Sequence, residues 1–185
     1  AGGAEVFFGK LDNTGSLVFV NVMNGLQDDR LYSITHDLNN DIILTGSFND
    51  SIVLNPNGTS QLLTDANGLS SFVAKFSSLG SYQWAFALSK CLPFGLSVDH
   101  DNNILTSGQF SGPTDFDPGV NSKILSGQVG SYDSYLAKYT SNGNYIFANR
   151  FGGNQLDCAY AVHEMADSTI AVSYTHLTLP TSNLV

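Results

Sequence analysis

Positive charge is scarce in this chain, and long apolar runs are missing. Seven lysines and arginines stand against sixteen aspartates and glutamates, which gives a formal net charge of −9. Such a surface repels phosphate backbones, so the composition argues against a nucleic-acid partner. No apolar run reaches the roughly 18 residues that a membrane span needs, so we expect no membrane insertion. The chain has no initiator methionine and no signal-peptide pattern at Ala1, and we interpret it as a fragment of a longer protein.

The residues that are abundant indicate a packed, turn-rich β protein. Hydrophobic residues make up 42% of the chain and aromatic residues 11%, whereas charged residues make up only 12%. The 185 residues include 18 glycines, which suits many tight turns. This composition argues against disorder, and the length is sufficient for one domain with a real core.

One motif occurs three times at nearly constant spacing. Each copy is a short apolar stretch around a lysine, a polar turn that closes on glycine, and a second apolar run. The lysines are Lys10, Lys75 and Lys138, separated by 65 and 63 residues. The pattern predicts a strand, a tight turn and a strand in each copy, and its regular recurrence indicates a repeat architecture.

A second motif lies between these hairpins. It spans residues 34–48, recurs at 96–110 after an offset of 62 residues, and starts again near Ala161. Each copy predicts two strands around a turn rich in Asn and Asp, because these residues tolerate the positive φ of hairpin turns. One repeat therefore carries four antiparallel strands, which describes a blade of a β-propeller.

The repeat is longer than the usual propeller blade of about 40 to 50 residues. The excess follows Phe48 and Phe110, where stretches rich in Pro and Gly predict a small additional hairpin. We therefore expect an all-β fold, a β-propeller fragment of about two and a half repeats. The expected repeat units lie near residues 7–71, 72–134 and 135–171.

Four phrases resemble a known family. They are Phe-Val-Ala-Lys-Phe at 72–76, Asp-Phe-Asp-Pro-Gly at 115–119, Ser-Asn-Gly-Asn-Tyr-Ile-Phe-Ala at 141–148 and Phe-Gly-Gly at 151–153. Together they are similar to the SBBP-type β-propeller repeats of bacterial secreted and surface proteins, over about residues 4–171. The resemblance implies a secreted or cell-surface location. It also implies a parent chain with several more blades that close into a ring.

The last fourteen residues, 172–185, do not continue the repeat. From Val172 to Thr181 the sequence resembles a translated sequencing adapter of the kind found at the ends of metagenomic contigs. We expect residues 1–171 to be the propeller repeat fragment and residues 172–185 to be a non-native tail.

The turns of the second motif place oxygen side chains at alternate positions, as calcium-binding loops do. The six candidate ligands are Asp37, Asn39, Asp41, Asp99, Asp101 and Asn103. However, a calcium site needs six or more oxygens, and Asn and Asp are favoured in tight turns for backbone reasons alone. We favour the turn interpretation, with calcium as the alternative and no other cofactor.

Three of the seven basic residues occupy one position of the repeat. A ring of lysines at positions 10, 75 and 138 would suit an anionic ligand. We favour the interpretation that strand alternation turns these lysines away from the apolar side, where they solvate an edge and discourage strand addition.

Histidine and cysteine are further candidates for chemistry. His36 and His163 are expected at equivalent places, each one residue before an acid. Val98 fills that place in the middle copy, so we interpret both histidines as structural. Cys91 and Cys158 fall in the same loop of successive repeats and are interpreted as small hydrophobes. The alternative is a disulfide between adjacent blades in an oxidising compartment.

No set of residues in the sequence combines a nucleophile with a base, or a metal with its ligands, so we predict no catalytic residues and no enzymatic activity. We expect an extracellular or cell-surface module that acts as a scaffold or as a binding platform for glycan or protein. Its other expected partners are neighbouring blades of the same parent chain. The alternative is the propeller of a secreted glycan-active hydrolase whose catalytic residues lie outside this chain. An enzyme would need non-repeated polar residues on its innermost strands, whereas these strands carry mostly Ile, Leu, Val, Ser, Thr and Ala.

Overall fold

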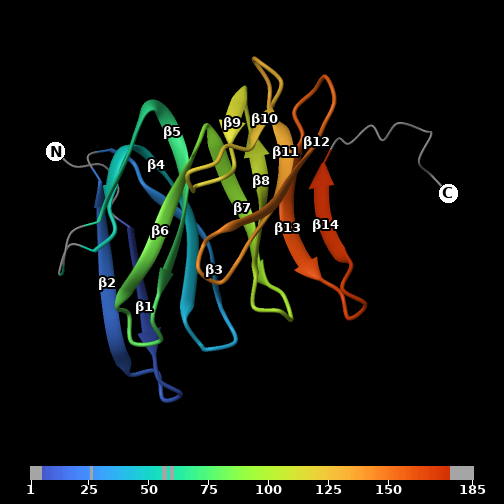
Figure 1. The fold of residues 1–185 in the computed structure, drawn as a ribbon. Helices are drawn as coiled ribbons and strands as arrows, with labels where there is room; N and C mark the ends of the chain where they lie inside the picture. Colours follow the sequence, from blue (N-terminus) through green and yellow to red (C-terminus); the bar gives the residue numbers. More distant parts are fainter. Residues whose placement is uncertain (1–5, 26, 56–57, 59–60, 176–185) are drawn as a thin grey trace.

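The computed structural model describes residues 6–25, 27–55, 58 and 61–175, and in them the chain folds into antiparallel β-sheets (Figure 1). Alternating and β-branched apolar residues, broken by turns of Gly, Asn, Asp and Ser, favour this all-β arrangement. The described residues contain no helix that could span a membrane. The strands are β1 (Val6–Leu11), β2 (Leu17–Gly25), β3 (Arg30–His36), β4 (Ile42–Val53), β5 (Leu62–Phe76), β6 (Tyr82–Ser89), β7 (Cys91–Val98), β8 (Ile104–Phe110), β9 (Pro113–Asp115), β10 (Ile124–Ser126), β11 (Asp133–Tyr139), β12 (Tyr145–Phe151), β13 (Cys158–Glu164) and β14 (Ile170–Thr175).

Two groups of four strands form antiparallel meanders. The first meander is β3-β4-β5-β6, which belongs to a six-stranded sheet that also contains β1 and β2. The second meander has the order β7-β8-β11-β12. Their registers correspond, because Ile43 lies opposite Lys75 in the first and Leu105 lies opposite Lys138 in the second. In both meanders the Asn-rich hairpin pairs with the lysine hairpin that follows it in the sequence.

A pair of strands, which matches half of a four-stranded meander, lies at each end of the stack of sheets (Figure 1). The pair β1–β2 corresponds to β11–β12, since Lys10 lies opposite Phe19 as Lys138 lies opposite Phe147. The pair β13–β14 corresponds to β7–β8 and supplies the strands predicted for the third copy. Of the expected non-native tail, residues 172–175 lie in β14 and residues 176–185 lie outside the described residues.

The additional hairpins predicted in each repeat are present. In the second meander they are β9 and β10, and in the first meander β4 and β5 simply extend beyond Asn49. Leu54 accordingly corresponds to Phe116, because each donates its backbone N–H across the hairpin, at 2.9 and 3.0 Å, and each side chain is buried. Both hairpins lie at the end of the sheets opposite the Asn-rich turns (Figure 1).

Successive sheets pack face to face, and the central strands are buried on both sides. Ile43 and Val73 face the core shared with the second meander, whereas Leu44 and Phe72 face the core shared with β1 and β2. A third, smaller core lies between the second meander and β13–β14. The first strand of each group, β3, β7 and β13, contacts the next one along the stack. The described strands form an open stack in which the ring predicted for the parent is not closed.

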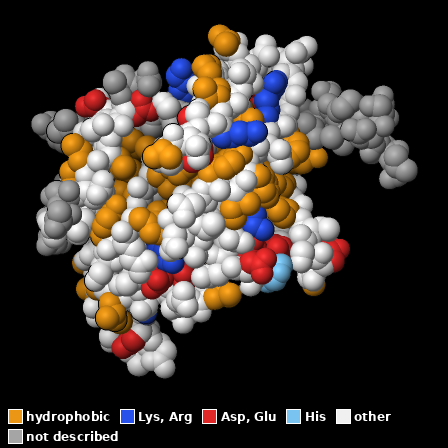
Figure 2. Space-filling view, in the orientation of Figure 1, with side chains coloured by type: hydrophobic (Ala, Val, Ile, Leu, Met, Phe, Trp, Pro, Cys, Tyr) orange, Lys and Arg blue, Asp and Glu red, His pale blue; other side chains and the backbone are white. Residues whose placement is uncertain are grey.

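Surface side chains are mostly uncharged. Apolar side chains are scattered over the face shown in Figure 2, between short clusters of charge. On β2, the exposed apolar side chains include Leu17, Val18 and Val20. Scattered exposure of this kind is normal for a folded protein and does not mark a site by itself.

Candidate functional site

The turn after β3 begins at Asp37, whose side chain holds the turn together. Asp37 Oδ1 accepts hydrogen bonds from the backbone N–H groups of Asn39 and Asp41, at 2.8 and 2.9 Å. In the turn after β7, Asp99 Oδ1 accepts from the N–H of Asn103 at 2.6 Å. Asn and Asp favour tight turns because their side chains satisfy the backbone in this way. These acids therefore serve the backbone, as the turn interpretation predicts.

Lys75, on β5, reaches the second carboxylate oxygen of Asp37. Its Nζ lies 2.7 Å from Asp37 Oδ2, and the two side chains are only 5% and 0% exposed. Lys138, on β11, makes the same ion pair with Asp99 at 2.6 Å. Both β5 and β11 are paired on each side, so neither lysine solvates an edge. The edge interpretation is wrong for Lys75 and Lys138, because each side chain is directed at the turn acid of its own meander.

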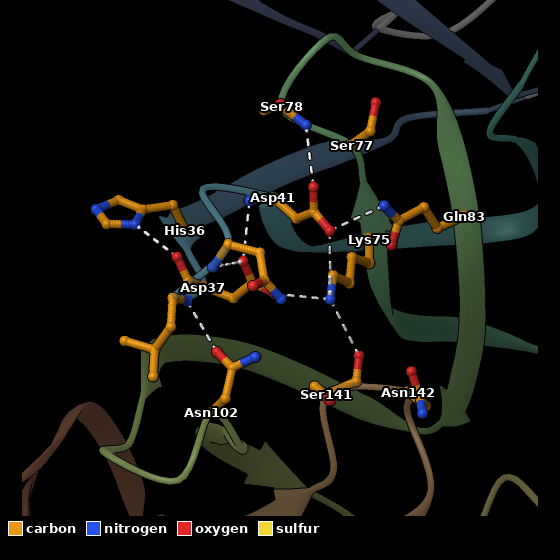
Figure 3. Close-up of polar contacts among 12 residues, drawn as sticks. His36, Asp37, Asp41, Lys75, Ser77, Ser78, Gln83, Asn102, Ser141 and Asn142 are labelled. Carbon is orange, nitrogen blue, oxygen red and sulfur yellow. Dashed lines mark hydrogen bonds and ion pairs between the residues drawn. The ribbon is translucent and has the colours of Figure 1, made fainter.

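The buried lysine also contacts the next group of strands (Figure 3). Lys75 Nζ donates to the carbonyl oxygen of Ser141, in the turn between β11 and β12, at 3.3 Å. Trp84 Nε1 donates to the same carbonyl at 3.3 Å. Lys10 makes the corresponding contact one group earlier and donates to the carbonyl of Ser78 at 3.0 Å. We name the set of lysine, turn aspartate of its own group and turn carbonyl of the next group the lysine junction.

The acids of the junction are held in the charged form. Burial alone would raise the pKa of Asp37, but hydrogen bonds from Lys75 and from the N–H groups of Asp41 and Asn39 outweigh burial. The pKa of Asp37 therefore lies below its usual range, and Lys138 and Asn103 act on Asp99 in the same way. An anion would have to displace a buried carboxylate to reach Lys75 or Lys138. The geometry thus weighs against the anion-ring alternative.

The turns of successive groups also contact one another. The N–H of Leu38 donates to Asn102 Oδ1 at 2.8 Å. At the corresponding place one group later, the N–H of His100 donates to Glu164 Oε2 at 2.8 Å, and His100 Nδ1 lies 2.7 Å from the same oxygen. The hydrogen bond with Glu164, assisted by the nearby charge of Asp101, raises the pKa of His100. The turn after β3 is therefore hydrogen-bonded to the turn after β7, and the turn after β7 to the end of β13.

The remaining calcium candidates are not gathered around one point. The Asp41 carboxylate accepts from the N–H of Ser78 at 3.1 Å and from Gln83 Nε2 at 2.9 Å. Asp101 is well exposed, and its Oδ1 lies 3.4 Å from His100 Nε2. Within the described part of the chain, no three acidic, His or Cys side chains are placed so that they could hold a metal ion together.

The register of β13 corrects one expected equivalence. Glu164 lies opposite Ile170 as His36 lies opposite Ile42, so the counterpart of His36 is Glu164 and not His163. Met165 stands where an aspartate opens the other two turns, so the acid that follows His163 is not the counterpart of Asp37. Both cysteines, at positions 91 and 158, are free and buried.

Buried acids at the opposite end of the sheets were not predicted. Asp29 and Asp157 directly precede β3 and β13 and are 2% and 1% exposed. Desolvation raises the pKa of Asp29 to about 6. Asp133, at the start of β11, is also buried and pairs with Arg150 through two contacts, of 3.1 and 3.3 Å. The sequence signal for these acids was an aspartate directly before β3 and again directly before β13.

A row of aromatic rings across the inner strands was also missed. Tyr32, Phe94 and Tyr160 occupy the bulge of β3, β7 and β13 respectively. Their ring centroids are 5.2 and 5.4 Å apart, and Tyr160 is 52% exposed. Their spacing of 62 and 66 residues matches the repeat, so the sequence did contain the signal. We name these three residues the aromatic row.

No protein-family model matches the chain, and no curated protein matches it either. In the lysine junction, Lys75 and Lys138 each face the carboxylate of a turn aspartate. Backbone N–H groups donate to the other oxygen of that carboxylate. Lys75 thereby links Asp37 of its own meander to the Ser141 carbonyl of the second meander.

Proposed function

We propose that the chain is part of a β-propeller of the SBBP repeat type and acts outside the cell, secreted or at the surface, as a non-catalytic scaffold and binding platform for glycan or protein. The observation that carries the proposal is the buried lysine–aspartate ion pair, which occurs in both meanders as Lys75–Asp37 and Lys138–Asp99. A propeller blade is a four-stranded antiparallel sheet whose neighbours are arranged around a common axis. The strand order of both meanders and the contacts among β3, β7 and β13 support this architecture.

The surface that we assign to a ligand is the aromatic row. The polar side chains of the junction are already engaged with one another, whereas Tyr32 and Tyr160 present ring surface to solvent. Tyrosine supplies rigid contact area together with a polar hydroxyl, at low cost in side-chain entropy. A glycan or a peptide that lies across the inner strands would contact successive rings.

The test is a binding screen of the whole chain against immobilised glycans and candidate surface proteins. For a ligand that binds, we expect Tyr32→Ser and Tyr160→Ser to weaken binding by at least about tenfold. Leu79→Ser, at an exposed turn position, is the matched control and should leave binding unchanged. Release of sugar by the purified chain, in proportion to its concentration, would contradict the non-catalytic assignment.

A further inference from the structure

The first strand lacks a neighbour that its counterparts have. Strand β5 pairs with β4 and β6, and β11 pairs with β8 and β12. Within the described ranges, β1 pairs only with β2, so its other edge is open. An unpaired strand edge exposes a row of N–H and C=O groups that can pair with a further strand.

The face beside this open edge is apolar and hollowed. Grooves of about 550 and 370 Å³ run between β1 and β3. Their lining includes Phe7, Tyr32 and Ile34, of which Phe7 is 70% and Ile34 57% exposed. Further along the stack, the corresponding residues of β7, Phe94 and Leu96, are partly buried, and β7 packs against β3. The face of β3 thus lacks the cover that β3 itself gives to β7.

Lys10 lacks the acid that completes the junction elsewhere. Lys75 and Lys138 each pair with a turn aspartate, at 2.7 and 2.6 Å. Lys10 keeps the contact with the next group, the carbonyl of Ser78, but no described acidic side chain lies within 4.0 Å of its Nζ. The missing member of this junction is therefore an aspartate at the start of a turn.

From the open edge, the hollow face and the incomplete junction together, we infer that this end of the stack binds a two-stranded β-hairpin from a further repeat of the same kind. Its first strand lies on β3, its second strand pairs with β1, and its turn opens with an aspartate that meets Lys10. The inference rests on the repeat architecture proposed above, and it adds the surface, the register and the acid. It is an instance of strand addition, with the ion pair selecting the partner.

A second copy of this chain is a poorer occupant than such a hairpin. The pair β13–β14 has the right strand arrangement, but Met165 stands where the turn aspartate would be. Docked on β1, it would place a thioether next to the Lys10 ammonium. A hairpin like β7–β8, which carries Asp99, supplies both the apolar strand faces and the charge.

The test extends the chain with a hairpin that has these properties. A second copy of residues 91–133 is joined ahead of Val6, in place of residues 1–5, because residues 91–133 precede β12 and the rest of β11 in the same order and register. We expect the amides of β1 to exchange with solvent at least about tenfold more slowly than in the original chain, since their edge becomes paired. In the same extended chain, Asp99→Met in the added copy and Lys10→Met test the ion pair.

A double-mutant cycle isolates that pair. We expect each single substitution to raise the equilibrium constant for unfolding of the extended chain by tenfold or more. The double substitution should raise it little more than either single substitution does. In the original chain, Lys10→Met should change the equilibrium constant for unfolding less than about threefold, because no described acidic side chain pairs with Lys10 there. Additive effects in the cycle would refute the ion pair.

A second measurement covers an extension that fails to fold. A synthetic hairpin of residues 91–110 is titrated against the original chain, and protection of the β1 amides is followed with the native peptide and with its Asp99→Met form. If neither the extension nor the peptide protects β1, the inference is wrong. It is also wrong if the original chain associates with itself and protects β1 in doing so. Tyr32 lines the groove beside β1, whereas Tyr160 does not, so the glycan and protein screen is judged on Tyr160→Ser, and failure here is distinguishable from failure of the proposed function.

Discussion

Lys75 and Lys10 occupy one repeat position in different surroundings. Lys75 is buried against Asp37, whereas Lys10 is exposed and donates to a carbonyl only. Removing one member of a buried ion pair leaves the other charge desolvated and unpaired, which is far more costly than losing an exposed contact. The cost of losing the lysine therefore depends on its partner and burial, and not on its position in the repeat.

The first prediction compares these two lysines. Lys75→Met should lower the free energy of unfolding by about 3–5 kcal/mol, because the Asp37 carboxylate stays buried without its partner. Lys10→Met is the matched control and should cost less than about 1 kcal/mol. Urea denaturation of both variants measures the difference. Equal losses in the two variants would show that the junction contributes nothing beyond an exposed lysine.

The second prediction concerns Asp29 and pH. Its pKa is raised from 3.8 to about 6 in the folded protein, so the folded state holds more protons than the unfolded state between these values. The contribution of Asp29 to stability is therefore complete below pH 3.8 and is lost as the pH rises towards 6. Asp29→Asn removes this loss, so the variant should gain about 1–3 kcal/mol over the natural chain between pH 4 and pH 7.

The control for Asp29 is the exposed Asp50. Asp50→Asn removes one carboxylate at an exposed position, and all three proteins are unfolded with urea at each pH. Asp37 and Asp99 are present in all three proteins, so the difference between the curves of the two variants reports Asp29. Parallel curves for Asp29→Asn and the natural chain would mean that this carboxyl is not desolvated.

At the scale of the element, the buried ring of Phe116 anchors the additional hairpin of the second meander in the core. Phe116 is fully buried in the core between the meanders, and Tyr139 donates its hydroxyl to the Phe116 carbonyl at 2.9 Å. Phe116→Ala should cost about 3–5 kcal/mol, because it removes a large buried side chain and leaves a cavity. Val120→Ala, in the same loop but fully exposed, should change the free energy of unfolding by less than about 0.5 kcal/mol. Thermal unfolding of the two variants would refute the anchoring role if their midpoints coincide.

The hairpins were predictable because their information is local. Each lysine motif, its glycine turn and the following apolar run lie within a short stretch, and the structure has a strand pair at every one of them. The Asn-rich turns were predictable for the same reason, and Asn40 and Asn102 adopt the positive φ expected there, 63° and 66°. Local patterns were therefore sufficient for the elements.

The partners of the lysines were not predictable from local pattern. Lys75 and Asp37 belong to strand pairs that alternate along the sequence, and only the pairing of β4 with β5 brings them together. Before that pairing is known, a lysine among apolar residues is most simply explained as an outward-facing side chain. The same limitation concealed the aromatic row, whose rings meet across three separate strands.

At the scale of the whole molecule, the layers differ in how many neighbours they have. The central strands of the two meanders are covered on both faces, whereas β1–β2 and β13–β14 lie at the two ends of the stack. In a repeat protein, stability is approximately the sum of the stability of each repeat and its contacts with adjacent repeats. Amides of β4, β5, β8 and β11 should therefore exchange more slowly with solvent than those of β1 and β14, by at least about tenfold. Uniform exchange along the chain would indicate a single cooperative unit instead.

The two ends of the sheets are constrained very differently. At the turn end, Lys75 connects the Asp37 turn of the first meander to the β11–β12 turn of the second, so a residue gained or lost there would disturb two layers at once. At the other end, the first meander accommodates an extension of β4 and β5 where the second has the separate pair β9–β10, and the sheets are otherwise in the same register. Insertions are tolerated at that end because the spacing of the layers is set elsewhere. A protein lineage can therefore vary the length and sequence of the loops at one rim of the stack, and with them the surface offered to other molecules. The ion pairs and hydrogen bonds at the turn end, which hold the layers together, need not change.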